Sequence, residues 1–269
     1  DYILDALESL RSQTYENWEA IVVDDGSTDN TQILVSDLAK VDSRISYIYQ
    51  VNKGLPAARN TGIKAAKGTY IQLLDADDLL SPDKILQQVT ELEENGDVGV
   101  LYCRTRYFED SKKETLFTDL SLTNRPESLE NLDNKYETIG SFVRKNIMPV
   151  NAVLMRKSVI DVVGLQNEFY GSVEDWEYWI RCAFAGIKFK FSSSDAYAMV
   201  RVHQTSMSKS KEKMFNWGIQ LRSIIRDLID RSDLPIQEKT QLHRINNRRT
   251  KQLYQLLIEE MGFTNRVYL

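Results

Sequence analysis

The apolar positions in the N-terminal part of the chain follow two different periods. At the start, apolar residues recur at helical spacing, which predicts an amphipathic helix over residues 2–12. Its apolar face consists of Ile3, Ala6, Leu7 and Leu10. Short apolar runs follow, each leading into a helical pattern, and they predict strands over residues 19–23, 45–50, 70–74 and 98–103. This regular alternation predicts an α/β fold, with a mostly parallel central sheet and helices on both of its faces.

The regular alternation of strand and helix patterns ends after the fourth predicted strand. Residues 107–117 have the pattern of a hairpin, and residues 118–135 have that of a loop. Further along, the pattern predicts helices over residues 136–145, 158–164 and 174–185 and strands over residues 151–156, 188–191 and 196–202. Near the C-terminus, two apolar stripes at helical spacing are separated by a polar break that contains a proline. We therefore expect an α/β domain over residues 1–210 and a C-terminal helical extension over residues 211–269.

Carboxylates gather at the ends of two of the predicted strands. Asp24 and Asp25 end the first run, and Asp75, Asp77 and Asp78 follow the third. In a parallel sheet these ends meet at one edge, where open α/β sheets bind ligands. Carboxylates this close repel one another unless something positive lies between them, and a divalent cation that carries substrate phosphates would serve. A solvated acidic turn before a helix is the alternative interpretation.

Composition and charge narrow the class of protein. The chain has 269 residues, of which 42% are hydrophobic and 27% charged, as is typical of a globular protein. The net charge of -5 argues against nucleic acid as a partner. Cys103 and Cys182 lie in apolar patterns and are expected to be buried thiols in a reducing compartment. No apolar run approaches the roughly 18 residues that a membrane span needs, so we expect a cytoplasmic location.

Four segments resemble the motifs of family 2 glycosyltransferases, which have the GT-A fold. The segments are Tyr15–Asp29 with its Val-Asp-Asp-Gly-Ser core, Gly54–Gly62, the Leu-Asp-Ala-Asp-Asp run of residues 74–78, and the Glu-Asp-Trp-Glu run that opens residues 174–181. The third resembles the DXD metal motif of the family and the fourth its ED-W motif. The order and spacing of the segments make the resemblance specific. It implies a Rossmann-like domain with a nucleotide-sugar-binding half over residues 1–103 and an acceptor-binding half over residues 104–210.

The resemblance assigns the donor's nucleotide to the first two motifs. Asp25 would accept a hydrogen bond from the base, and Asp24 could share this role. Arg59 would lie near the diphosphate, where the start of its helix also favours an anion. A nucleotide-diphospho-sugar is the implied donor, and a UDP-sugar is the one we expect.

The resemblance assigns a divalent metal, Mn²⁺ or Mg²⁺, to the DXD motif. Asp77 would hold the metal, Asp75 would contact the metal or the donor ribose, and Asp78 would orient the turn. His203 matches a family position near the donor phosphates, which gives it a role on the metal or the phosphates. A histidine at a strand end is also often an ordinary surface or core residue, and that interpretation stays open.

The ED-W motif would supply the chemistry at the acceptor. Asp175 resembles the catalytic base, which takes a proton from the acceptor hydroxyl as its oxygen attacks the anomeric carbon, and neighbouring Glu174 would tune it. In-line attack inverts the anomeric configuration. Trp176 would line the acceptor site, and Trp179 is expected in the core. Acids at the start of a helix are also favoured by the helix dipole alone, so the motif taken by itself has a structural explanation.

The family begins with an apolar strand that ends in a Pro-x-Tyr-Asn type of turn, and this sequence starts after it. We expect that the strand precedes the present sequence in the full protein and adds donor contacts. The acceptor is expected to be a saccharide or a lipid-linked saccharide, in cell-surface polysaccharide or glycoconjugate synthesis. The alternatives are a nucleotidyltransferase and a non-catalytic module that binds a sugar nucleotide.

The C-terminal extension carries the least specific pattern. Its stripes would pack on the catalytic domain or join two chains in a homodimer. A third possibility is a peripheral contact with the inner face of the membrane, because the second stripe carries a set of basic residues that suit anionic headgroups. These are Arg244, Arg248, Arg249 and Lys251. A solvated charged face explains the same residues.

Overall fold

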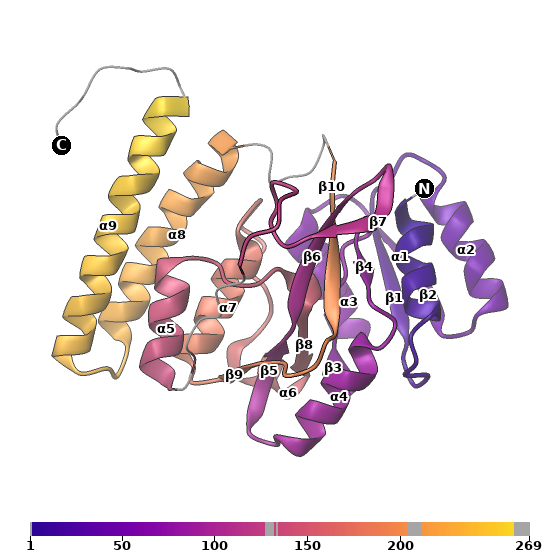
Figure 1. The fold of residues 1–269 in the computed structure, drawn as a ribbon, viewed down its shortest axis with the longest axis horizontal. Helices are drawn as coiled ribbons and strands as arrows, with labels where there is room; N and C mark the ends of the chain where they lie inside the picture. The colour runs from indigo at the N-terminus through magenta and orange to yellow at the C-terminus, as the bar shows by residue number, and fades with distance from the viewer. Residues whose placement is uncertain (1, 127–131, 133, 204–210, 261–269) are drawn as a thin grey trace. The chain divides into compact units, whose positions relative to one another are not determined.

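The computed structural model describes residues 2–126, 132, 134–203 and 211–260 (Figure 1). The chain divides into two compact units. The first unit comprises Asp1–Leu129, Met148–Glu168 and Ile187–His203, and the second comprises Glu130–Ile147, Phe169–Gly186 and Gln204–Leu269. Residues 211–269, which we expect to form a separate extension, thus belong to the same unit as residues 130–147 and 169–186. This division of the chain differs from the boundary expected at residue 210.

The first unit contains the alternating strands and helices that the sequence predicts. Its N-terminal half consists of α1 (Tyr2–Arg11), β1 (Ala20–Asp25), α2 (Thr31–Val41), β2 (Ile45–Gln50), α3 (Leu55–Ala65), β3 (Tyr70–Ile71), β4 (Leu79–Leu80), α4 (Lys84–Glu94) and β5 (Val98–Tyr102). The rest consists of β6 (Arg104–Glu109), β7 (Lys112–Phe117), the 3₁₀ turn η1 (Val150–Ala152), β8 (Val153–Arg156), α6 (Ser158–Val163), β9 (Lys188–Phe191) and β10 (Tyr197–Val202).

Strand pairing in this unit includes both parallel and antiparallel pairs. The parallel pairs are β1 with β2, β6 with β10, and β5 with β9. The antiparallel pairs are β4 with β10, β6 with β7, β3 with β8, and β5 with β8. The expected strand over residues 70–74 pairs through Tyr70 and Ile71, and the side chain of the next residue, Gln72, donates to the carbonyl oxygen of Asn151.

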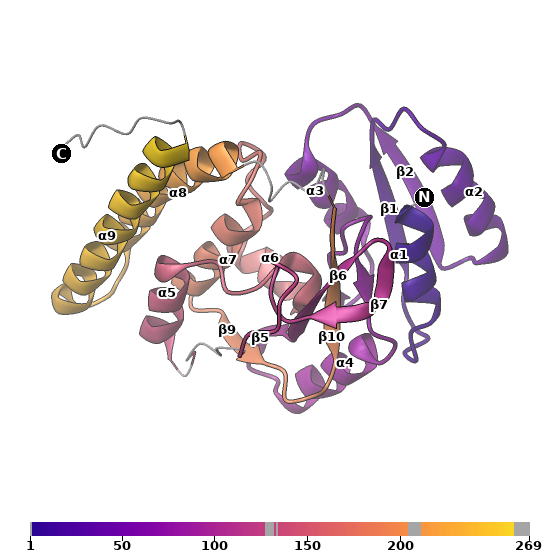
Figure 2. The same ribbon diagram turned by 45° about the horizontal axis from the view of Figure 1, so that its top comes forward.

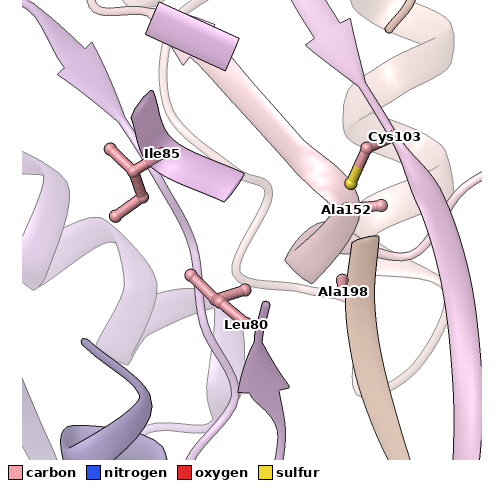
Figure 3. Packing of buried hydrophobic residues seen from close by; sticks show 5 residues of the cluster. All are labelled: Leu80, Ile85, Cys103, Ala152 and Ala198. Carbon is pink, nitrogen blue, oxygen red and sulfur yellow. The ribbon is translucent and has the colours of Figure 1, made fainter. Parts of the chain in front are cut away.

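One antiparallel strand pairing places the acidic turn. β4 lies directly after Asp75–Asp78 and pairs with β10, so the turn is held beside the end of β10. The hydrophobic core beneath it joins five elements or their flanks, as Figure 3 shows. Its buried members are Leu80, Ile85, Cys103, Ala152 and Ala198. Cys103 is a buried free thiol, as the sequence predicts, and so is Cys182 in the other unit.

The second unit is helical. It contains α5 (Lys135–Arg144), α7 (Glu174–Phe184), α8 (Lys211–Arg231) and α9 (Ile236–Glu260). Helices α8 and α9 run side by side in both views (Figures 1 and 2), and they contact α7 and α5, respectively. The apolar stripes predicted for the tail therefore bury residues against helices of the same unit, including Leu221 and Leu242. Among the described helices, none is both long and apolar enough to cross a membrane.

Lys84 is a buried cation in the first unit. Its ammonium group donates to the side-chain oxygens of Gln72 and Gln88. Burial lowers the pKa of Lys84 from its ordinary 10.5 to about 8. Between these two values the unfolded chain binds a proton that the folded protein does not, so the folded protein gains stability as the pH rises.

We expect the free energy of unfolding to rise by no more than about 3 kcal/mol between pH 8 and 10.5 because of this group. The rise should disappear in Lys84→Met and persist in Lys64→Met, in which the changed side chain is exposed. Urea unfolding at a series of pH values measures the difference. Parallel pH profiles for the wild type and Lys84→Met would show that Lys84 keeps its ordinary pKa.

Candidate functional site

The Asp75–Asp78 turn is held by a buried amide, Asn151. The turn closes through the hydrogen bond from the Asp78 amide to the Asp75 carbonyl oxygen, 3.1 Å. Asn151 lies in η1 and is 1% exposed. Its Oδ1 accepts from the amide of Asp75 at 2.8 Å, and its Nδ2 donates to the carboxylate of Asp78. One side chain therefore binds both ends of the turn.

Asp78 points into the protein. Its carboxylate also accepts from the backbone amide of Arg201 at 2.7 Å, and only 4% of the residue is exposed. Burial raises the pKa of Asp78 to about 8, and the negative charges of Asp75 and Asp77 act in the same direction, while the hydrogen bond from Arg201 opposes them. These contacts are those of a residue that holds the turn, whereas Asp75 and Asp77 remain closer to the surface.

The structure brings Asp77 together with His203. Their Oδ2 and Nε2 atoms are 2.9 Å apart, and the side chains are 36% and 15% exposed. His203 directly follows β10, which lies next to β4 in the sheet, so the strand order puts the imidazole beside the turn. Asp75 instead meets Arg59, whose guanidinium donates to Asp75 Oδ1 at 2.7 Å. Both pairs join residues that lie far apart in sequence, and their roles at a metal and a diphosphate stay predictions.

The donor atoms at this turn suit a divalent cation in part. Carboxylate oxygens and an imidazole nitrogen are ligands that Mn²⁺ accepts, and oxygen is the ligand that Mg²⁺ prefers. Among the residues that the structure describes, however, there is no group of three or more His, Cys, Asp or Glu placed to hold a metal ion. Asp77 and His203 therefore fit a cation whose remaining ligands come from elsewhere, such as the phosphate oxygens of a substrate.

Asp24 is engaged within the protein. The Tyr47 hydroxyl donates to Asp24 Oδ2 at 2.6 Å, and the Ser27 amide donates to Oδ1 at 2.7 Å. Burial acts to raise the pKa of Asp24, but these hydrogen bonds outweigh it and hold the pKa below its ordinary value. Burial and the same carboxylate raise the pKa of Tyr47 to about 12. Asp24 thus anchors the turn after β1.

Asp25 binds the loop that leads into α3. Its carboxylate accepts from the amides of Lys53 at 2.9 Å and Gly54 at 2.8 Å, and from Gln50 Nε2 at 2.7 Å. Gly54 has a φ of 91°, a backbone conformation that glycine adopts without steric cost. Because Arg59 lies one turn into this helix, Asp25 also influences where the guanidinium lies. The base-binding role of Asp24 and Asp25 stays a prediction.

The ED-W motif opens α7 in the second unit. Val173, the residue before it, has a φ of 59° and a ψ of 18°, a left-handed conformation that is rare and costly for a β-branched side chain. Asp175 Oδ2 accepts from Asn146 Nδ2 at 2.9 Å, and Oδ1 accepts from the Trp176 amide at 2.6 Å. Glu174 is buried. Backbone strain of this kind is concentrated at functional sites, which favours a functional role for the motif over simple helix capping.

Trp176 is held by two neighbours in the same unit. Its Nε1 donates to the carbonyl oxygen of Phe142 in α5 at 2.8 Å, and the guanidinium of Arg222 lies 4.7 Å from the ring centroid. The side chain is half-buried, whereas Trp179 is fully buried, as the sequence predicts. An acceptor-binding role for Trp176 stays a prediction.

Sequence reasoning missed Asn151 and Arg201. Both are buried polar residues whose side chains contact the acidic turn. The sequence does indicate that Arg201 has buried partners, because it is a charged residue within the apolar strand Tyr197–Val202. Asn151 gives no such signal, since a single amide before a strand has many ordinary explanations.

Solved structures identify the fold. A crystal structure of S. aureus TarS, residues 1–349, in complex with UDP-GlcNAc matches all of this chain and 73% of its own with a TM-score of 0.70, at 18% sequence identity. The mannosyltransferase PcManGT from Pyrobaculum calidifontis, in complex with GDP-Man and Mn²⁺, matches 99% of this chain and 72% of its own with a TM-score of 0.63, at 16% identity. The chain thus has the α/β architecture of GT-A glycosyltransferases, which confirms the predicted fold class.

Sequence comparison identifies the family. The family model described as Glycosyl transferase family 2 matches residues 1–162, more than half of the chain, so the chain belongs to this family, as the motifs predict. EpsH of Bacillus subtilis (strain 168) is 32% identical over 225 residues, which are 82% of this chain and 63% of EpsH. The uncharacterized glycosyltransferase EpsJ of the same organism is 39% identical over 141 residues, 51% of this chain and 40% of EpsJ. The chain therefore spans less than two thirds of the length of these relatives.

Removing the Asn151 amide should destabilise the first unit. Asn151→Ala leaves a buried Asp78 carboxylate and the Asp75 amide without this partner, and we expect the free energy of unfolding to fall by about 2–4 kcal/mol. Asn30→Ala is the matched control, because Asn30 is exposed and its side chain makes no capping hydrogen bond to α2. Chemical denaturation compares the two variants. Equal losses in both would contradict the bridging role.

Proposed function

We propose that the protein transfers a sugar from a nucleotide-diphospho-sugar to an acceptor hydroxyl with inversion at the anomeric carbon. The observation that carries the proposal is the pairing of Asp77 with His203 and of Asp75 with Arg59 around one turn. This turn combines acidic ligands for a cation with a guanidinium that suits a diphosphate. Family membership supports the same activity, and TarS, a structural neighbour, has been solved with UDP and with UDP-GlcNAc. A UDP-sugar is therefore the donor we propose.

Asp77, Asp75 and His203 would hold a divalent cation, Mn²⁺ or Mg²⁺. The bound cation would neutralise the negative charge of the leaving nucleoside diphosphate. Arg59 would then turn from Asp75 toward the phosphates, because a guanidinium binds carboxylate and phosphate oxygens with the same planar geometry. Asp25 and Asp24 would support the nucleotide through the loop and turn that they hold, and would accept a hydrogen bond from its base.

Asp175 would act as the catalytic base. It accepts the proton of the acceptor hydroxyl while the oxygen forms its bond to the anomeric carbon and the bond from that carbon to the phosphate oxygen breaks. The amides of Asn146 and Trp176 already fix the orientation of the Asp175 carboxylate. Glu174 would tune this group, and Trp176 would contact the acceptor, for which a saccharide or a lipid-linked saccharide of cell-surface polysaccharide synthesis is our proposal.

Two alternative functions, a nucleotidyltransferase and a non-catalytic module, have less support than glycosyl transfer. Membership of a glycosyltransferase family disfavours a nucleotidyltransferase. A non-catalytic module that binds a sugar nucleotide would need the acidic turn but not the strained segment before Asp175. We therefore favour catalysis. For the tail, the packing of α8 and α9 on α7 and α5 supports an intramolecular role. A homodimer, or a peripheral contact of a cytoplasmic protein with the membrane through exposed Arg244 and Arg248, stays a secondary proposal.

We expect Asp77→Ala to abolish metal-dependent donor binding, because it removes the carboxylate that faces His203. Calorimetric titration with UDP in the presence of Mn²⁺, and again with a chelator, measures the effect. The wild type should bind UDP only with the metal, whereas the control Asp195→Ala, at a fully exposed site, should bind as the wild type does. Donor binding that survives both chelation and Asp77→Ala would exclude the proposed metal role.

We expect Asp175→Asn to reduce turnover by at least about a thousandfold while UDP affinity stays within about twofold, because only the base is lost. The amide keeps the shape of the carboxylate but has a far weaker affinity for a proton. Asp227→Asn, on the same unit, serves as the matched control. Release of nucleoside diphosphate from a UDP-sugar panel, with water or a saccharide as acceptor, reports turnover. Full turnover in Asp175→Asn would remove this mechanism.

A further inference from the structure

Arg201 is a fully buried arginine at the end of β10, and its contacts reach three separate segments of the first unit. The guanidinium Nε donates to the backbone carbonyl oxygen of Asp77 at 2.8 Å. One terminal nitrogen donates to Asp5 Oδ2 in α1 at 2.8 Å, and the other donates to Asp110, in the turn between β6 and β7. Side-chain exposure is 0%, so the charge of Arg201 depends on these partners.

The backbone of Arg201 reinforces the contact with the acidic turn. Its amide donates to Asp78 Oδ1 at 2.7 Å, while its side chain binds the carbonyl oxygen of Asp77, the preceding residue. Two consecutive residues of the turn are therefore bound by one residue of β10. An arginine that served only to neutralise charge would need the carboxylates of Asp5 and Asp110 but not this carbonyl.

Tyr2 contacts both Arg201 and the imidazole of His203. The Arg201 guanidinium lies 4.5 Å from the centroid of the Tyr2 ring, and the Tyr2 and His203 rings are 5.3 Å apart. Phe108 in β6 contributes a second ring, 4.8 Å from the guanidinium. Helix α1 therefore contacts Arg201 through an aromatic ring and an acid, Tyr2 and Asp5. Strand β6 and the turn after it do the same through Phe108 and Asp110.

We propose that Arg201 is a positioning residue that sets the geometry of Asp77 against His203, and thereby the affinity for a divalent cation and the donor diphosphate. The proposal rests on the proposed function for its ligand. The backbone of Asp77 is fixed by the guanidinium, so the carboxylate leaves the chain in a defined direction, toward Nε2 of His203. Asp5 and Asp110 fix the guanidinium in turn, which ties the placement of Asp77 to α1 and to the hairpin.

The planar shape of the guanidinium is essential to this role. Three nitrogens of Arg201 reach three acceptors in three directions within one plane, which a lysine ammonium on a flexible stem does not reproduce. Arg201→Lys therefore keeps the positive charge but loses the contacts that define the direction. Partners that orient metal ligands typically contribute about 10–100-fold to metal affinity.

The test measures Mn²⁺ binding and Mn²⁺-dependent UDP binding in Arg201→Lys, at a temperature at which the variant is folded. We expect both affinities to fall by about tenfold or more. Arg222→Lys is the matched control, because Arg222 is also a buried arginine bound to a backbone carbonyl, in the second unit. It should lose stability without a change in either affinity. Unchanged affinities in Arg201→Lys would overturn the proposal.

Asp110→Asn provides a milder variant should Arg201→Lys fail to fold. Asp110 is 49% exposed, so the change should be tolerated, and it weakens one of the two carboxylate contacts of the guanidinium. We expect Mn²⁺ affinity to fall by about threefold to tenfold, and by no further amount when Asp110→Asn is added to Arg201→Lys, since both act through the same contact. Additive losses would show that Asp110 acts independently of Arg201.

The ¹⁵N NMR signal of the His203 imidazole separates this proposal from the proposed function, because it needs no ligand. Arg201→Lys should shift the signal as Asp77 moves, and Arg222→Lys should leave it in place. A shift together with a wild type that binds neither Mn²⁺ nor UDP would refute the donor site and keep the positioning role. An unshifted signal in Arg201→Lys would refute the positioning role, whatever the wild type binds.

Discussion

Repulsion among three carboxylates within four residues is the constraint on which the first unit depends. At this spacing, the folded protein must supply a hydrogen-bond donor or a positive charge to each carboxylate. The chain supplies a different partner to each: Arg59 to Asp75, His203 to Asp77, and the Arg201 amide to Asp78. Because these partners come from α3 and from the end of β10, the acidic turn can exist only where those elements meet.

The same partners keep the outer two acids available for a ligand. The buried Asp78 takes the cost of desolvation, while Asp75 and Asp77 keep partners that a diphosphate or a cation can replace or join. The antiparallel pairing of β4 with β10 holds this turn, with its buried acid and its two more exposed acids, beside the end of β10.

In the second unit, the Asp175 carboxylate is held in a fixed orientation. Val173 is held in a left-handed conformation, and Asp175 is then bound by a side-chain amide from beyond α5 and by the amide of Trp176. Helix α8 contributes to this rigidity, since its Arg222 donates to the carbonyl oxygen of Val143 and lies over the Trp176 ring. The tail is therefore part of the scaffold that carries the motif.

The sequence by itself determined the alternation of strands and helices over residues 1–103 and the family, because these depend on local periodicity and on short motifs read in order. The base, the metal ligands and the acceptor contacts that it indicates remain predictions. Tertiary structure alone decided the mixed strand pairing and the roles of Asn151 and Arg201. Both residues act on Asp75–Asp78 from more than 70 positions further along the chain. No local pattern encodes such contacts, because strand order, rather than spacing in the sequence, decides which buried polar group meets which carboxylate.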